Sequence, residues 1–156
     1  MSVIKYCSVF SVSAVVLFSA SNFAQTNDPE QLMHERHENF ETIGESFKAI
    51  RDQLRSGNAD MAIIATSAQT INTLAQELHT WFPEGTGPET GIETEAKAEI
   101  WQDKDGFNAA ASRLVEESGK FATLASSGDA SAIMGGVQSL GGACKNCHDT
   151  YRVDDD

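Results

Sequence analysis

The most informative part of the sequence is DPEQLMHERHENFETIGESFKAIRDQLRS, residues 28–56. Its large side chains recur at steps of three and four residues, which is the spacing of one face of an α-helix. That face consists of Met33, Arg36, Phe40, Ile43, Phe47, Ile50 and Leu54. Asp28 is a typical N-cap residue, Pro29 suits the first helical position, and a Ser-Gly-Asn sequence ends the pattern at 56–58. The stretch therefore predicts one long amphipathic helix with a single cation in its apolar line.

Similar apolar spacing recurs three more times, and strand-like alternation is almost absent. We expect further helices at about 59–80, 93–124 and 130–152. Only the Pro- and Gly-rich stretch 81–88 forms a long connection, because the other breaks are short turns. Four amphipathic helices in one chain of 156 residues predict an all-α, antiparallel up-down four-helix bundle that forms a single domain over 25–156.

The first 24 residues have the pattern of an export signal. Lys5 precedes an uncharged run that is too short for a bilayer span, and small residues lead to a cleavage site after Ala24. We therefore expect a signal peptide at 1–24 and a periplasmic location. The chain carries a net charge of −12, which makes nucleic acid and anionic membrane surfaces poor partners.

The sequence Cys144-Lys145-Asn146-Cys147-His148 has the C-x-x-C-H spacing that attaches c-type haem. On a helix with about 100° per residue, Cys147 and His148 lie on either side of Cys144 and project from one face. The two thiols then reach the vinyl groups of one porphyrin while the imidazole meets the iron. We expect one covalently bound haem c per chain, with His148 as the metal ligand. The alternatives are a thioredoxin-like redox pair, a zinc site and a simple disulfide.

Nearly all of the chain from the first helix to Arg152 resembles cytochrome c′. The resemblance rests on the following groups of residues: 144–152 (CKNCHDTYR), Arg36 with Phe40, 82–86 (FPEGT), and Ile100-Trp101 with Phe107. It implies a haem-bearing four-helix bundle, usually dimeric, with five-coordinate high-spin iron that binds nitric oxide and carbon monoxide. It also implies that Arg36 contacts a haem propionate and that Arg152 lies beside the proximal histidine.

Phe40 is the residue that bears on the vacant axial position. In low-spin relatives of the family this position is Met, whereas a phenyl ring cannot ligate iron. We expect Phe40 to shield an apolar distal pocket that admits small neutral gases. Arg36 is costly in an apolar line unless it meets an anion, and the alternative to a propionate is a Glu on a neighbouring helix.

Other side chains offer a sixth ligand less readily. Met33, Met61 and Met134 fall on or beside the inward faces and are expected to fill the core. His37 is the strongest rival, although it lies one residue off the inward line, and His34 and His79 are expected at the surface.

The expected function is gas binding by a periplasmic haem protein, with nitric oxide buffering or electron transfer as its role, and not enzymatic turnover. The alternatives are a six-coordinate low-spin electron-transfer cytochrome, and a haem enzyme that reduces nitric oxide or peroxide. The expected partners are nitric oxide, carbon monoxide, a redox partner protein and a second copy of the chain.

Overall fold

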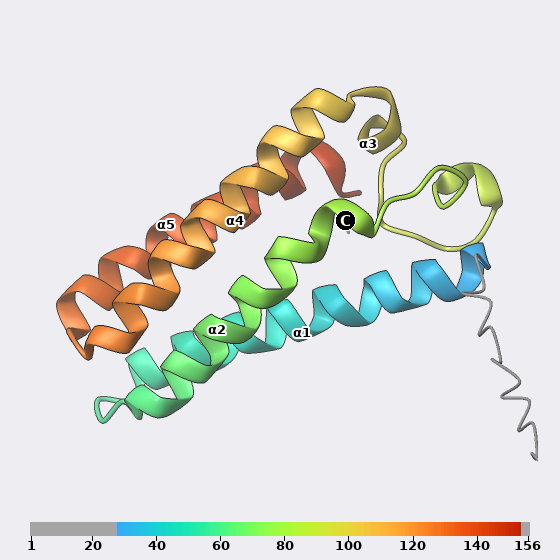
Figure 1. Ribbon diagram of the computed structural model, residues 1–156. Coiled ribbons are helices and arrows are strands. Elements are labelled where there is room, and N and C mark those ends of the chain that lie inside the picture. The colour runs from blue at the N-terminus through green and yellow to red at the C-terminus, as the bar shows by residue number, and fades with distance from the viewer. Residues whose placement is uncertain (1–27, 154–156) are drawn as a thin grey trace, which may run out of the picture.

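The computed structural model describes residues 28–153, most of which are helical and none of which forms a named strand (Figure 1). The four long helices are α1 (Pro29–Arg55), α2 (Met61–Glu77), α4 (Lys104–Ser127) and α5 (Ala130–Tyr151). Between α2 and α4 lie two 3₁₀ turns, Leu78–Thr80 and Pro88–Thr90, and the one-turn helix α3 (Glu99–Gln102). The predicted four-helix bundle is confirmed, and the predicted signal peptide at 1–24 lies outside the described residues.

An aspartate caps the N-terminus of each long helix. Asp28 accepts a hydrogen bond from the Glu30 N–H (3.1 Å), and Asp60, Asp103 and Asp129 accept equivalent bonds at the starts of α2, α4 and α5. Each cap satisfies a backbone donor that the helix leaves unpaired and contributes about 1 kcal/mol. Part of the chain's acidic character is therefore used to define where its helices begin.

The helices pack in the order α1, α2, α4, α5, each antiparallel to the one before it (Figure 1). The sides between α1 and α2, α2 and α4, and α4 and α5 are closely packed, whereas α1 and α5 approach each other at few positions. The core holds large side chains that are almost completely buried: Ile50, Ile64, Ile71, Leu78, Phe121, Ile133 and Leu140. None of the helices within 28–153 is long and apolar enough to span a bilayer.

The third helix begins later than its apolar pattern predicts. We expected it at 93, whereas α4 begins at Lys104 after the Asp103 cap and the short helix α3. The chain around 95–97 instead lies extended beside the end of α5. Its backbone forms an isolated antiparallel bridge between Ala96 and Arg152, and the Lys97 N–H donates to the Tyr151 carbonyl (2.9 Å). This long-range pairing outweighs the local helical preference of residues 93–98.

Candidate haem site

The C-x-x-C-H motif occupies the last two turns of α5, which is helical through Tyr151. Both cysteines are half-buried and pack against the edge of the hydrophobic core, while His148 is exposed. On the outer side of the same turns, Lys145 pairs with Asp149 (2.6 Å). The predicted arrangement is confirmed in one respect: the three residues lie on one continuous helix, as reaching a single porphyrin requires.

The surroundings of the motif keep its side chains neutral. Burial raises the pKa of Cys144, and burial followed by the nearby Cys144 raises the pKa of Cys147 to about 11. Desolvation of its ring, followed by the positive charge of Arg152, lowers the pKa of His148. A neutral imidazole is the form that binds a metal, whereas thiols with raised pKa values are poor nucleophiles.

The geometry does not support the three alternatives for this motif. Cys144 and Cys147 are free thiols, not a disulfide. Within residues 28–153, no group of three or more His, Cys, Asp or Glu side chains is arranged to hold a metal ion, so a zinc site lacks its fourth ligand. The raised thiol pKa values are also opposite to those of a redox-active pair at a helix N-terminus.

Arg36 is a buried cation whose partners are all neutral. Its side chain is 4% exposed, and its Nη1 and Nη2 atoms both donate to the Thr86 carbonyl at 3.1 Å. Further bonds reach the Trp81 carbonyl, the Thr86 hydroxyl and Thr94 Oγ1, at 3.2–3.4 Å. Within residues 28–153 it forms no ion pair, so the expected alternative of a neighbouring Glu is not observed.

Burial lowers the pKa of Arg36 to about 10, which reflects the cost of a charge without a counter-ion. Its guanidinium also lies 4.6 Å from the centre of the Phe82 ring, in a cation–π contact. These neutral contacts satisfy the geometry of the guanidinium without neutralising its charge. An anionic group beside the Arg36 guanidinium would neutralise this charge.

Phe40 belongs to an aromatic cluster that connects α1 with the end of α5. Its ring lies edge-on to Trp81 at 5.3 Å and 6.1 Å from Phe82. Phe82 in turn contacts Phe107 (4.9 Å), which contacts Tyr151 (5.4 Å), one turn after Cys147. The cluster forms an apolar wall near the C-terminal end of α5, and the shielding of an iron atom by Phe40 stays a prediction.

The candidate sixth ligands lie in unsuitable places. His34, His37 and His79 are exposed; His37 pairs with Glu41 (3.4 Å) and His79 contacts Asn108 (3.3 Å). Met33 is buried as predicted, but its sulfur accepts a hydrogen bond from Thr90 (3.8 Å).

The other two methionines differ from each other. Met61 packs at the edge of the core as expected, at the N-terminus of α2. Met134 is 49% exposed, so its expected place in the core is wrong. The reason is that it lies off the buried line of α5 defined by Ile133, Leu140 and Ala143.

Arg152 lies just beyond α5, where its N–H caps the helix by donating to the His148 carbonyl (3.1 Å). Its Nε donates to Glu95 Oε2 at 2.8 Å. The sequence predicted a cation beside His148 but did not predict Glu95 as its partner. Thr86 and Thr94, the partners of Arg36, were missed for the same reason: they lie in the long connection, whose path the helical pattern does not specify.

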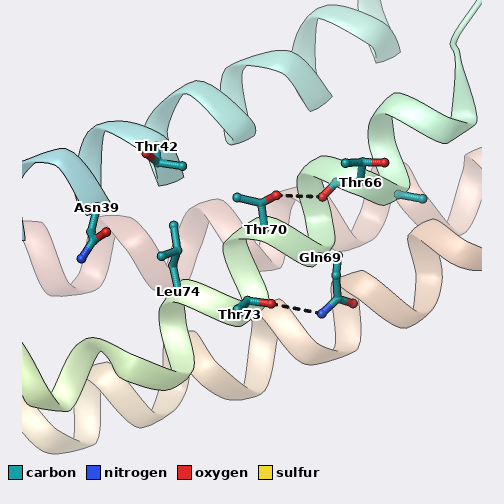
Figure 2. Close-up of a pocket in the computed structure, with 8 residues that line it drawn as sticks. Asn39, Thr42, Thr66, Gln69, Thr70, Thr73 and Leu74 are labelled. Atoms are coloured by element: carbon teal, nitrogen blue, oxygen red, sulfur yellow. Dashed lines mark hydrogen bonds between the residues drawn. The ribbon is translucent and has the colours of Figure 1, made fainter. Parts of the chain in front are cut away.

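A surface groove of about 660 Å³ lies elsewhere, along α1 and α2 (Figure 2). It is lined by uncharged residues: Asn39, Thr42, Ala65, Thr66, Gln69, Thr70, Thr73 and Leu74. The polar groups that Figure 2 connects are satisfied within α2, since Thr70 donates to the Thr66 carbonyl and Gln69 to Thr73. The groove contains none of the predicted haem-site residues.

Comparison with known proteins identifies the family. The sequence profile described as Cytochrome C′ matches residues 31–152. The chain belongs to the cytochrome c′ family. It is 33% identical over 144 residues to cytochrome c′ of Rhodospirillum rubrum, which covers 92% of this chain and 96% of the relative.

Solved cytochromes c′ have the same bundle. One with ligand-controlled dimer dissociation matches with a TM-score of 0.76 at 25% identity, over 81% of this chain and 97% of its own. The nitric oxide complex of a variant cytochrome c′ from Alcaligenes xylosoxidans matches with a TM-score of 0.72, at the same identity and coverage.

Cytochromes c′ carry a covalently bound c-type haem. Three features of this chain fit that group. Cys144 and Cys147 are free and His148 is neutral, so the attachment and ligand atoms are available. The charge of Arg36 lacks a carboxylate partner within 28–153, and a haem propionate is such an anion. The Phe40 cluster supplies an apolar wall for a flat macrocycle.

Proposed function

We propose that this chain is a periplasmic cytochrome c′ with one covalent haem c, held by Cys144 and Cys147, and with His148 as its only protein ligand to iron. Haem supplies an iron atom that, when one axial position is vacant, binds nitric oxide and carbon monoxide. The chain's own residues determine whether that position is vacant, what reaches it, and how the group is oriented.

The observation that carries the proposal is the placement of the histidines and methionines. His37 is paired with Glu41, His79 contacts Asn108, and His34 is exposed on α1. The methionines are exposed, near the far end of α2, or engaged with Thr90. The apolar cluster around Phe40 instead reaches Tyr151 at the end of α5, next to the motif. Among residues 28–153 we therefore expect no side chain that makes the iron six-coordinate and low-spin.

An apolar path to the iron, lined by the Phe40 cluster, selects ligands by their charge and hydration. Nitric oxide and carbon monoxide are small and neutral and lose little on leaving water, whereas an anion loses a large hydration energy. The nitric oxide complex of the Alcaligenes xylosoxidans relative supports this choice of ligand. We therefore assign the chain to reversible gas binding, with nitric oxide buffering or electron transfer as its role.

The alternative of a haem enzyme requires a proton donor or acceptor next to the ligand. Two ionisable groups reach the aromatic rings of the Phe40 cluster: Arg36, whose pKa is near 10, and the Tyr151 phenol, which donates to Asp103 (2.9 Å) and whose pKa is raised to about 12. Both remain protonated at neutral pH. Such a pocket favours binding over multistep proton chemistry. Sustained reduction of nitric oxide or peroxide by the purified protein would contradict this assignment.

The proposal is tested by ligand titration of the haem-loaded protein, followed by its absorption spectrum. We expect the ferrous protein to bind carbon monoxide and nitric oxide tightly, and the ferric protein to bind cyanide or azide poorly. Equal affinity for anions and gases would contradict an apolar distal pocket. Loss of the pigment on denaturation in acid acetone would contradict covalent attachment.

The proposed protein partner is a second copy of this chain, docked along α1 and α2. The chain has a net charge of −12, so two copies repel each other unless their contact is uncharged. From Met61 to Gln76, α2 contains no charged residue, and the groove beside it is lined by threonines and apolar atoms. The uncharged face of α2 therefore lets two acidic copies meet without placing like charges from this helix against each other.

Sedimentation analysis tests the dimer. Thr66→Asp places two carboxylates near one another in a two-fold interface and should give a monomer. Thr123→Asp, on the exposed side of α4, adds the same charge outside the proposed contact and should leave the dimer intact. A monomeric parent protein, or dissociation by both variants equally, would refute this interface.

A further inference from the structure

Residues 94–97, here called the strap, are held against the end of α5 by backbone hydrogen bonds. The Lys97 N–H donates to the Tyr151 carbonyl (2.9 Å), and the Val153 N–H donates to the Glu95 carbonyl (2.8 Å). These bonds flank the antiparallel bridge between Ala96 and Arg152. The strap is therefore attached to the chain immediately after the haem-attachment motif, although about 50 residues separate the two segments.

The side chains of the strap contact both arginines of the candidate haem site. Glu95 accepts a hydrogen bond from Arg152 Nε at 2.8 Å, next to the helical turn that carries His148. Thr94 Oγ1 accepts from Arg36 Nη2 at 3.2 Å and also from the Ala96 N–H at 3.2 Å. One four-residue segment thus reaches a cation from α1 and a cation from the end of α5.

We propose that the strap is a positioning element for the haem site, in which Glu95 acts through Arg152 and Thr94 acts through Arg36. This inference rests on the proposed haem function, because the two arginines flank the haem only if the haem is attached to α5. Glu95 is a positioning residue and touches neither the motif cysteines nor His148 in any contact that the structure shows.

The physical consequence concerns charge beside the proximal ligand. Arg152 follows the turn that carries His148 and donates its N–H to the His148 carbonyl (3.1 Å), while its side chain pairs with Glu95 (2.8 Å), so the Glu95 carboxylate offsets a positive charge beside the proposed iron ligand. Neutralising Glu95 leaves more positive potential next to the iron ligand, which favours the reduced state of a bound metal. It also removes one attachment of the strap, so the backbone bonds at Lys97 and Val153 should open more often.

Glu95→Gln removes the carboxylate charge with little change in shape, and Glu93→Gln is the matched control. Glu93 is exposed and lies two residues earlier in the same connection. Both variants change the net charge equally, so general electrostatics affects them alike. Glu95→Asp keeps the charge and should restore the parent behaviour in part.

Two readouts are measured on the haem-loaded proteins. Hydrogen exchange at the Lys97 and Val153 amides should become about threefold faster in Glu95→Gln, as expected for loss of a partly exposed ion pair, and should not change in Glu93→Gln. The haem reduction potential should shift upward in Glu95→Gln by more than in the control. Unchanged exchange, or equal potentials in the two variants, would overturn the role of Glu95.

Thr94→Val tests whether the strap acts as one unit. It removes the acceptor for Arg36 and for the Ala96 N–H, while leaving Glu95 and Arg152 in place. If the strap couples the two arginines, exchange at the Val153 amide should also become faster. Exchange confined to residues next to Thr94 would overturn the coupling. A chain that carries no haem but shows these exchange effects would overturn the proposed function while leaving the strap's structural role intact.

Discussion

The replacement Phe40→Ala tests how the distal side of the proposed haem site controls access. Phe40 is half-buried on α1, with its ring edge-on to Trp81 at 5.3 Å and tilted against Phe82 at 6.1 Å. Removing the phenyl ring leaves the side chains on the far wall of the cluster in place. The variant therefore opens the approach to the iron without altering the attachment residues.

The magnitude follows from the packing of the ring. A fully buried Phe→Ala replacement costs about 3–5 kcal/mol, so a half-buried ring contributes roughly 2 kcal/mol, of which the two ring contacts supply about 1. An incoming gas has to displace this ring, and the displacement costs energy of the same order. Removal of a barrier of about 2 kcal/mol speeds association by roughly 30-fold.

The assay is carbon monoxide association with the ferrous haem protein, measured by stopped flow or flash photolysis. Leu54→Ala is the control, because Leu54 is also half-buried on α1 but lies 14 residues from Phe40, about 21 Å along the helix. We expect faster association only in Phe40→Ala, together with a lower free energy of unfolding in both variants. An association rate within twofold of the parent would refute the gating role of Phe40.

Three further predictions concern the same end of the bundle. His148→Ala should abolish the native haem spectrum while the covalent pigment remains, and retention of that spectrum would show that another side chain holds the iron. Thr86→Val removes a hydroxyl that donates to the Pro83 carbonyl (2.8 Å) and accepts from Arg36 (3.2 Å). Because each partner then lacks one hydrogen bond, the free energy of unfolding in urea should fall by about 2–3 kcal/mol. A fall below about 0.5 kcal/mol would contradict the burial of these groups. Burial, followed by the hydrogen bond to Asp103 (2.9 Å), raises the pKa of Tyr151 from the usual value of 10 to about 12. The phenol's contribution to stability is therefore present below pH 10 and is lost as the pH rises toward 12. Tyr151→Phe should therefore lower the free energy of unfolding by about 1 kcal/mol at pH 7 and flatten its decline between pH 10 and 12; an unchanged decline would show that another group titrates.

The helices were predictable because their signals are local. Asp28, Asp60 and Asp129 stand directly before periodic apolar runs, and the side chains that a 3.6-residue period places on one face are those that the core buries. The start of α4 was not predictable in this way. The apolar spacing continues back through 93–98, but this segment pairs with the end of α5. A local sequence pattern does not indicate which segment about 50 residues away a stretch of chain will pair with.

In the candidate haem site, too, the residues with a local signal were predictable and those that depend on distant contacts were not. Cys144, Cys147 and His148 are identified by their spacing alone, because one helical segment provides all three. Arg36 signals its need for polar partners by interrupting an apolar line, but the identity of Thr86 and Thr94 depends on the path of an irregular connection. Met134 was expected in the core but is exposed. It lies one position away from the buried line of α5, and a difference of one position on a helix is enough to place a side chain at the surface.

The central claim is that His148 is the only side chain bound to the iron. Resonance Raman spectroscopy of the reduced, ligand-free haem protein at neutral pH reports coordination number and spin state directly. The spectrum should be that of a five-coordinate, high-spin haem with a single histidine ligand. A six-coordinate, low-spin spectrum would contradict the account, because it would require a second strong ligand that the placement of the histidines and methionines within 28–153 does not provide.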